Sequence, residues 1–236
     1  MENTFARLGI NEALVAGLYK AEITTPTPIQ AAVIPDILNG RDVIGQSANK
    51  TRKTLAYLLP LFQKIDASKR EMQAIILSPT HELALQIFRQ AELLANNSGV
   101  PVTSAVIIGD VNITRQIDKL KEKPHIIVGS AGRILELVQK RKINAQTIKT
   151  IVIDEADRLL EDSNRASVAA VIKATQKDRQ LMLFSATITP AAVEKAGEWM
   201  QDPVFASLQT ESAVPAEITH AYFLSEARDK IDILRK

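Results

Sequence analysis

The sequence contains no cysteine. This absence excludes a disulfide framework and any metal site with cysteine ligands, and it is compatible with a reducing compartment. No apolar run approaches the length needed to span a membrane, and the N-terminal sequence Met1-Glu2-Asn3-Thr4 does not resemble a signal peptide. We therefore expect a cytoplasmic protein without membrane attachment.

A large excess of charge of either sign is also missing. The 29 lysine and arginine residues nearly balance the 27 aspartate and glutamate residues, for a net charge of +2. This total neither indicates nor excludes nucleic-acid binding, because a local basic stripe can hide in a balanced sum. The 236 residues, 46% of them hydrophobic, are sufficient for one globular domain with a full core.

Strand-like runs alternate with helical patterns, and several of these runs are continuously apolar, as in strands covered on both faces. The alternation predicts an α/β fold with an open, mainly parallel sheet and helices on both faces. The predicted strands are Asp42–Gly45, Ala74–Leu77, Thr103–Ile107, His125–Val128, Thr150–Ile153, Gln180–Phe184 and Val204–Leu208. Predicted helices include Glu82–Ala95, Ile134–Gln139 and Ala191–Met200.

The first forty residues differ from this pattern. Glu12–Tyr19 has the pattern of a helix, and the proline-rich residues 24–28 predict a rigid turn. Pro28 suits the first position of a second helix, Ile29–Leu38, which Gly40 would close. We expect residues 1–40 to precede a domain at 41–210.

The C-terminal residues have the pattern of further secondary structure. His220–Leu224 is strand-like, and an amphipathic helix starts at Arg228 and stops after two turns. We expect residues 211–236 to be a linker and the start of a second domain that is missing from this chain.

A β-branched run at Thr150–Ile153 ends in the acidic sequence Asp154-Glu155-Ala156-Asp157. A strand that ends in acids can place a metal-binding carboxylate at the edge of a parallel sheet, where a second acid orients a water. The alternative is a strand that runs into a helix N-terminus, where acids suit the helix dipole.

A second candidate motif follows the first predicted strand, at residues 46–54. Lys53-Thr54 at a strand-to-helix turn is typical of a phosphate-binding loop, in which lysine reaches the β- and γ-phosphates and threonine holds Mg²⁺. The usual glycine before the lysine is replaced by Arg52. A basic surface loop is the alternative interpretation of this segment.

Further short motifs occur in a fixed order around these two. The ordered motifs are Phe5, Pro26-Thr27-Pro28-Ile29-Gln30, Lys53-Thr54, Pro79-Thr80-His81-Glu82-Leu83-Ala84, Gly109, Ser130-Ala131-Gly132-Arg133, Asp154–Asp157 and Ser185-Ala186-Thr187. Taken together, they resemble the first RecA-like domain of the DEAD-box RNA helicases over nearly the full chain. The resemblance implies an ATP-dependent RNA helicase, a hydrolase acting on ATP, whose second RecA-like domain would begin where this chain ends.

The resemblance implies ATP and Mg²⁺ as ligands. Gln30 would read adenine through a bidentate amide contact, and Phe5 would stack near the base. Lys53, Asp154 and Glu155 would be catalytic, with Asp154 and Thr54 holding Mg²⁺ largely through water and Glu155 orienting the attacking water. The implied ATP-binding residues are Phe5, Thr25, Gln30, Ser47, Ala48, Asn49, Lys50, Thr51, Arg52, Lys53 and Thr54.

The resemblance also implies a second partner, an RNA backbone bound without sequence readout through phosphates and 2′-hydroxyls. The implied RNA-binding residues are Pro79, Thr80, His81, Glu82, Gly109, Ser130, Gly132 and Arg133. Asp157, Ser185 and Thr187 would couple the nucleotide to the missing domain, and the fragment would be monomeric.

The chain departs from the family pattern at these functional loops. Lys50 and Arg52 stand at the two glycine positions of the phosphate loop, where a side chain costs strain of about 1–3 kcal/mol if the loop keeps its shape. On the RNA side, His81 replaces an arginine, Asp110 a glycine and Ala131 a proline, and the first two weaken attraction for phosphate.

Three interpretations stay open at this stage. The chain is the ATP- and RNA-binding domain of a helicase, which unwinds duplexes only as part of the full-length protein. Alternatively, it is a helicase-shaped RNA- or protein-interaction module that binds ATP weakly or not at all, because Lys50 and Arg52 replace glycines. The loop changes could also be engineered or lineage drift.

Overall fold

The computed structural model describes residues 4–47, 53–109 and 111–208, and every structural statement below concerns these residues. Three predictions lie outside them. These are the conformation of the phosphate-loop residues 48–52, the strand His220–Leu224 and the helix after Arg228.

Seven strands form one sheet in the order β3-β4-β2-β5-β6-β1-β7, and each neighbouring pair is parallel. The predicted α/β class with a parallel sheet is confirmed, and strand ends differ from the predicted ones by no more than two residues. The strands are β1 (Val43–Ser47), β2 (Ala74–Leu77), β3 (Ser104–Ile107), β4 (Ile126–Gly129), β5 (Thr150–Asp154), β6 (Gln180–Ser185) and β7 (Val204–Leu208).

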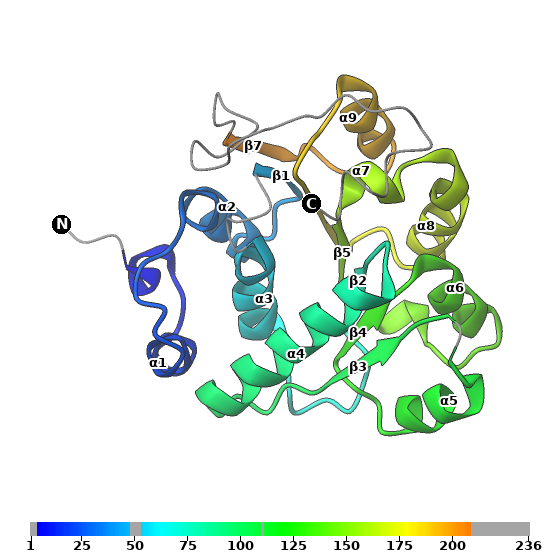
Figure 1. Ribbon diagram of the computed structural model, residues 1–236, viewed down its shortest axis with the longest axis horizontal. Helices are drawn as coiled ribbons and strands as arrows, with labels where there is room; N and C mark the ends of the chain where they lie inside the picture. Colours follow the sequence, from blue (N-terminus) through cyan, green and yellow to red (C-terminus); the bar gives the residue numbers. More distant parts are fainter. Residues whose placement is uncertain (1–3, 48–52, 110, 209–236) are drawn as a thin grey trace, which may run out of the picture.

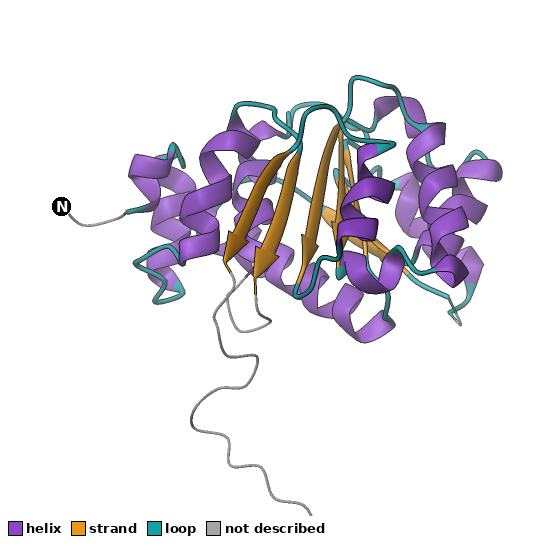
Figure 2. Ribbon diagram, turned by 90° about the horizontal axis from the view of Figure 1, so that it is seen from above, coloured by secondary structure: helices purple, strands orange, loops and turns teal. Residues whose placement is uncertain are grey.

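Helices cover both faces of the sheet (Figures 1 and 2). On one face, the core cluster takes its side chains from α1 (Glu12–Lys20), α2 (Pro28–Leu38), α3 (Lys53–Lys64) and α4 (His81–Ser98). The cluster on the other face takes them from α5 (Ile113–Lys121), α6 (Ala131–Gln139), α7 (Ala156–Leu159), α8 (Asp162–Ala174) and α9 (Pro190–Gly197). Two short 3-10 helices, η1 (Phe5–Leu8) and η2 (Ala145–Thr147), complete the described elements.

Successive strand residues divide between the two clusters, as the alternation of side chains along a strand requires. In β2, Ile76 packs toward α3 and α4, whereas Ile75 and Leu77 pack on the opposite face. The strands β1, β2, β4, β5 and β6 are buried along their whole length, while the edge strands β3 and β7 are buried only in part. The expectation that both faces are covered is therefore correct.

The N-terminal helices begin as their sequences predict. Pro28 occupies the first turn of α2, and the side-chain Oε1 of Gln30 accepts a hydrogen bond of 2.8 Å from the Thr27 backbone N–H. This is half of a capping box, which satisfies donors that a helix start leaves open. Gly40, which follows the C-cap residue Asn39, has a φ of +81° and donates its N–H to the Ile37 carbonyl oxygen, so it closes the helix as predicted.

Candidate functional site at the carboxyl edge of the sheet

The strand order brings the predicted nucleotide-binding and RNA-binding residues to neighbouring parts of the carboxyl edge of the sheet. Because all strands are parallel, their carboxyl ends meet at that edge, where open α/β sheets bind ligands. Ser47, Asp154 and Ser185 end the adjacent strands β1, β5 and β6. The other group follows β2, β3 and β4, on the far side of β5.

Asp154 is the last residue of β5 and is only 4% exposed. Its Oδ2 accepts a hydrogen bond of 2.9 Å from the Tyr57 hydroxyl, and its Oδ1 accepts one of 3.0 Å from the Glu155 backbone N–H. Burial raises the pKa of this carboxyl, while the Tyr57 hydrogen bond and the charge of Lys53 oppose the rise. Both carboxylate oxygens are thus oriented by the protein.

Lys53 begins α3 and is only 7% exposed, so its side chain is largely shielded from solvent. Burial lowers its pKa, and the charges of Asp154, Asp157 and Glu155 act in the opposite direction. The predicted catalytic lysine and the acidic motif are therefore electrostatically coupled. Thr54 follows on the same helix, whereas Ala48, Asn49, Lys50, Thr51 and Arg52 lie outside the described residues.

Glu155 has a left-handed backbone conformation, with φ 52° and ψ 54°, which few residues other than glycine adopt. It precedes α7, and its carboxylate pairs with Arg158 at 3.5 Å. Strained residues of this kind gather at functional sites, where the surrounding structure holds them. The turn lets Asp154 and Glu155 lie at the sheet edge before α7 starts.

Asp157 is joined to the end of β6. Its backbone N–H donates to Ser185 Oγ at 3.3 Å, and its Oδ2 accepts from the Thr187 hydroxyl at 2.7 Å. The predicted coupling residues are in direct contact, and their interdomain role stays a prediction.

The predicted adenine-binding residues differ in their exposure to solvent. Gln30 is fully buried, and its Oε1 accepts the hydrogen bond from the Thr27 N–H, so its amide does not lie on the helix surface. Phe5 is 2% exposed and belongs to the hydrophobic core, whereas Thr25 is exposed. Their roles toward a base stay predictions.

The predicted RNA-binding residues lie after β2, β3 and β4. Thr80 caps α4 by accepting the Leu83 N–H at 3.2 Å, so Pro79 and Thr80 form the entry to that helix. A Cβ at Gly109 would lie 3.4 Å from His81 Nε2, which places the first and second RNA motifs side by side. Glu82 and Gly132, which belong to these motifs, are exposed. The Ser130 N–H donates to the Ile107 carbonyl oxygen.

Arg133 is engaged within the protein. Its Nη1 donates to the Val111 carbonyl oxygen at 3.1 Å, and its Nε pairs with Glu136 Oε2 at 3.0 Å. The side chain is 16% exposed. It joins α6 to the segment after β3, so contact with a phosphate would compete with these two interactions.

Sequence interpretation missed one polar residue of the site, Tyr57. A fully buried tyrosine on an apolar helix was not distinguished from an ordinary core residue. The available signal was its position three residues after Thr54, since residues at that spacing share a helix face.

Asp154 and Thr54, beside Lys53, fit an Mg²⁺ ion whose remaining ligands are water and phosphate oxygens. Within residues 4–47, 53–109 and 111–208, no three metal-ligating side chains gather closely enough to hold an ion by themselves. One carboxylate and a hydroxyl beside a lysine suit Mg²⁺, which keeps several waters and uses few protein ligands.

Comparison with known proteins agrees with this geometry. The family model described as DEAD/DEAH box helicase matches residues 27–196. The chain belongs to the DEAD/DEAH box helicase family. It is 41% identical over 217 residues to the DEAD-box ATP-dependent RNA helicase CshC of Bacillus cereus, covering 92% of this chain and 55% of that protein. It is 38% identical over 211 residues to the probable ATP-dependent RNA helicase YfmL of Bacillus subtilis, covering 89% and 56%.

Solved DEAD-box structures share the RecA-like fold. A DEAD box protein from Methanococcus jannaschii aligns with a TM-score of 0.82 and 28% identity, over 98% of this chain and 62% of that one. Saccharomyces cerevisiae Dbp5 bound to RNA and ADP BeF3 aligns with a TM-score of 0.77 and 30% identity, over 88% and 52%. The chain spans about half the length of the curated relatives it matches.

Proposed function

We propose that this chain is the N-terminal, ATP- and RNA-binding domain of a DEAD-box RNA helicase. ATP hydrolysis is coupled to duplex unwinding only when a second RecA-like domain is present. The observation that carries the proposal is that Lys53, buried at the start of α3, interacts electrostatically with the buried carboxylate of Asp154 at the end of β5. A phosphate chain with its cation needs this combination of ammonium and carboxylate.

Each group has a defined task in the proposal. Lys53 would bind phosphate oxygens, and Thr54 and Asp154 would hold Mg²⁺, which would supply charge neutralisation for phosphoryl transfer. Glu155, held ahead of α7 by its left-handed turn, orients the attacking water.

RNA is the second ligand of the proposal, bound through its backbone by the loops after β2, β3 and β4. The Ser130 hydroxyl and the backbone N–H groups at the start of α6, that of Gly132 among them, would face the phosphates, and such contacts fix register without reading sequence. We place the domain in the cytoplasm as a monomer that pairs with its second RecA-like domain. None of the helices in the described ranges is both long and apolar enough to cross a membrane.

Calorimetry with ATP and Mg²⁺ tests the nucleotide site. We expect weak binding, because Lys50 and Arg52 replace the loop glycines, and Lys53→Ala should remove the binding that remains. Micromolar affinity would contradict the expected weakness. An absence of binding even after both glycines are restored would overturn the ATP-binding proposal itself.

A second candidate function rests on the same substitutions: a helicase-shaped module that binds RNA or protein without ATP. It predicts salt-dependent retention of RNA in the absence of nucleotide. Filter binding of single-stranded RNA at 50 and 200 mM salt, with and without ATP, separates the two. RNA binding that ATP never changes favours the module, and enhancement by ATP favours the helicase domain.

A further inference from the structure

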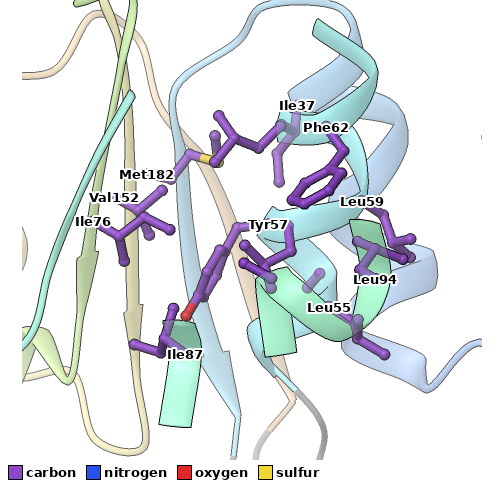
Figure 3. Packing of buried hydrophobic residues seen from close by; sticks show 14 of the residues in the cluster. Ile37, Leu55, Tyr57, Leu59, Phe62, Ile76, Ile87, Leu94, Val152 and Met182 are labelled. Carbon is purple, nitrogen blue, oxygen red and sulfur yellow. The ribbon is translucent and has the colours of Figure 1, made fainter. Parts of the chain in front are cut away.

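Tyr57 lies on α3, fully buried, with its ring between that helix and the strands that carry Ile76, Val152 and Met182 (Figure 3). The ring centroid is 5.3 Å from that of Phe184, in a tilted arrangement. A phenylalanine would fill the same apolar space without the cost of burying a hydroxyl. The hydroxyl therefore calls for a separate explanation.

The hydroxyl reaches the candidate metal site. It donates a hydrogen bond of 2.9 Å to Asp154 Oδ2, across 97 residues of sequence. Burial raises the pKa of this phenol well above its usual value, Asp154 adds to the rise, and a hydrogen bond with the Thr54 side chain opposes it. The hydroxyl thus lies between Thr54 and Asp154, the two groups proposed to hold Mg²⁺.

These contacts restrict the carboxylate of Asp154. Tyr57 holds Oδ2 and the Glu155 N–H holds Oδ1, so rotation of the carboxyl plane would break one hydrogen bond or the other. Each oxygen keeps a further lone pair for a metal-bound water. Partners of this kind orient ligands and tune metal affinity although they never touch the ion.

We propose that Tyr57 is a positioning residue for Mg²⁺, whose hydroxyl holds the Asp154 carboxylate ready for the hydrated ion. The inference rests on the proposed ATP site and deepens it. In this proposal Tyr57 acts on the ion through Asp154 and not as a ligand itself.

Tyr57→Phe tests the inference because it deletes the hydroxyl and keeps the ring. The probe is Mn²⁺ with a non-hydrolysable ATP analogue, followed by electron paramagnetic resonance and by analogue binding in EDTA. We expect the half-saturating Mn²⁺ concentration to rise about 10-fold, in the range usual for loss of an outer partner. Analogue affinity in EDTA should stay unchanged, which a general loosening of the pocket would not allow.

The matched control is Tyr19→Phe, the same chemical change at a tyrosine that is 53% exposed on α1. All variants are made both in the natural chain and with Lys50→Gly and Arg52→Gly, so that a weak phosphate loop does not hide the metal effect. An unchanged Mn²⁺ requirement, or an equal loss of affinity in EDTA, overturns the role of Tyr57 and leaves the proposed function intact. Failure of the analogue to bind in either background overturns the proposed function, and the role of Tyr57 falls with it.

Discussion

The Thr187 hydroxyl donates a hydrogen bond of 2.7 Å to Asp157 Oδ2 and so links the segment after β6 to the start of α7. Ser185 Oγ accepts the Asp157 backbone N–H at 3.3 Å and reinforces the link. The end of the acidic motif is therefore tied to the next strand of the sheet.

Thr187→Val removes the hydroxyl donor and keeps the shape of the side chain. We expect the free energy of unfolding to fall by less than about 1 kcal/mol, because the bond is exposed to water. Backbone amides at the start of α7 should exchange hydrogen faster, since Asp157 loses a partner. Thr189→Val is the control, because Thr189 caps α9 instead and should accelerate exchange only there. Unchanged exchange in α7 would show that the link is not a restraint.

Gly129→Ala should strongly destabilise the domain. A Cβ at this last residue of β4 would lie 1.8 Å from the Ile107 carbonyl oxygen, which belongs to the backbone of β3 and cannot turn aside. We expect a loss of about 3 kcal/mol in the free energy of unfolding, at the upper end for overpacked cores. Urea denaturation measures it.

Gly132→Ala is the matched control for this prediction. Three residues further on, at the start of α6, a Cβ would meet nothing within 4 Å, so stability should stay within about 0.5 kcal/mol. Equal effects of the two substitutions would contradict the close approach of β3 and β4.

Asp42 predicts a pH dependence of stability. Its Oδ1 and Oδ2 accept the backbone N–H groups of Leu181 and Gln201 at 2.7 and 2.8 Å. Burial nevertheless raises the pKa of this carboxyl above its usual value, because desolvation outweighs these bonds. A raised folded-state pKa means that the folded protein retains the proton longer than the unfolded chain. The contribution to stability is therefore complete below the unfolded pKa and is lost as pH rises through the folded one.

Asp42→Asn should flatten this decline in unfolding free energy with rising pH. It should also lower stability at every pH, because an amide NH₂ replaces one oxygen that accepts a backbone N–H. Urea denaturation at several pH values between 4 and 7 measures both effects. Asp178→Asn removes one exposed carboxylate and controls for net charge. A slope that stays as steep in Asp42→Asn as in the natural chain would contradict the assignment.

The local sequence pattern was sufficient to predict the strands and the residues at their ends. The apolar runs located every described strand, and parallel pairing then required Asp154 and Ser185 to lie at one edge. Contacts between distant segments could not be predicted from local pattern. The Tyr57 hydroxyl reaches Asp154 because α3 packs on β5. Arg133 reaches the Val111 carbonyl oxygen because α6 lies beside the segment after β3. The helix Ile113–Lys121 was not predicted, although its apolar residues recur at helical spacing.

Restoring glycine at positions 50 and 52 should strengthen ATP binding. A phosphate loop needs backbone N–H groups close to the phosphates, and a side chain at each glycine position costs about 1–3 kcal/mol in strain. Removing even one such penalty corresponds to at least about a 5-fold gain in affinity. Calorimetry of Lys50→Gly with Arg52→Gly, in ATP and Mg²⁺, measures the gain.

Lys50→Ala with Arg52→Ala is the control for that measurement. It removes the same two charges but keeps a Cβ at each position, so backbone strain would persist. If the alanine pair gains as much affinity as the glycine pair, charge or bulk limits binding and backbone freedom does not. If neither pair gains affinity, the defect lies outside the loop, and the buried pair of Lys53 and Asp154 becomes the place to look.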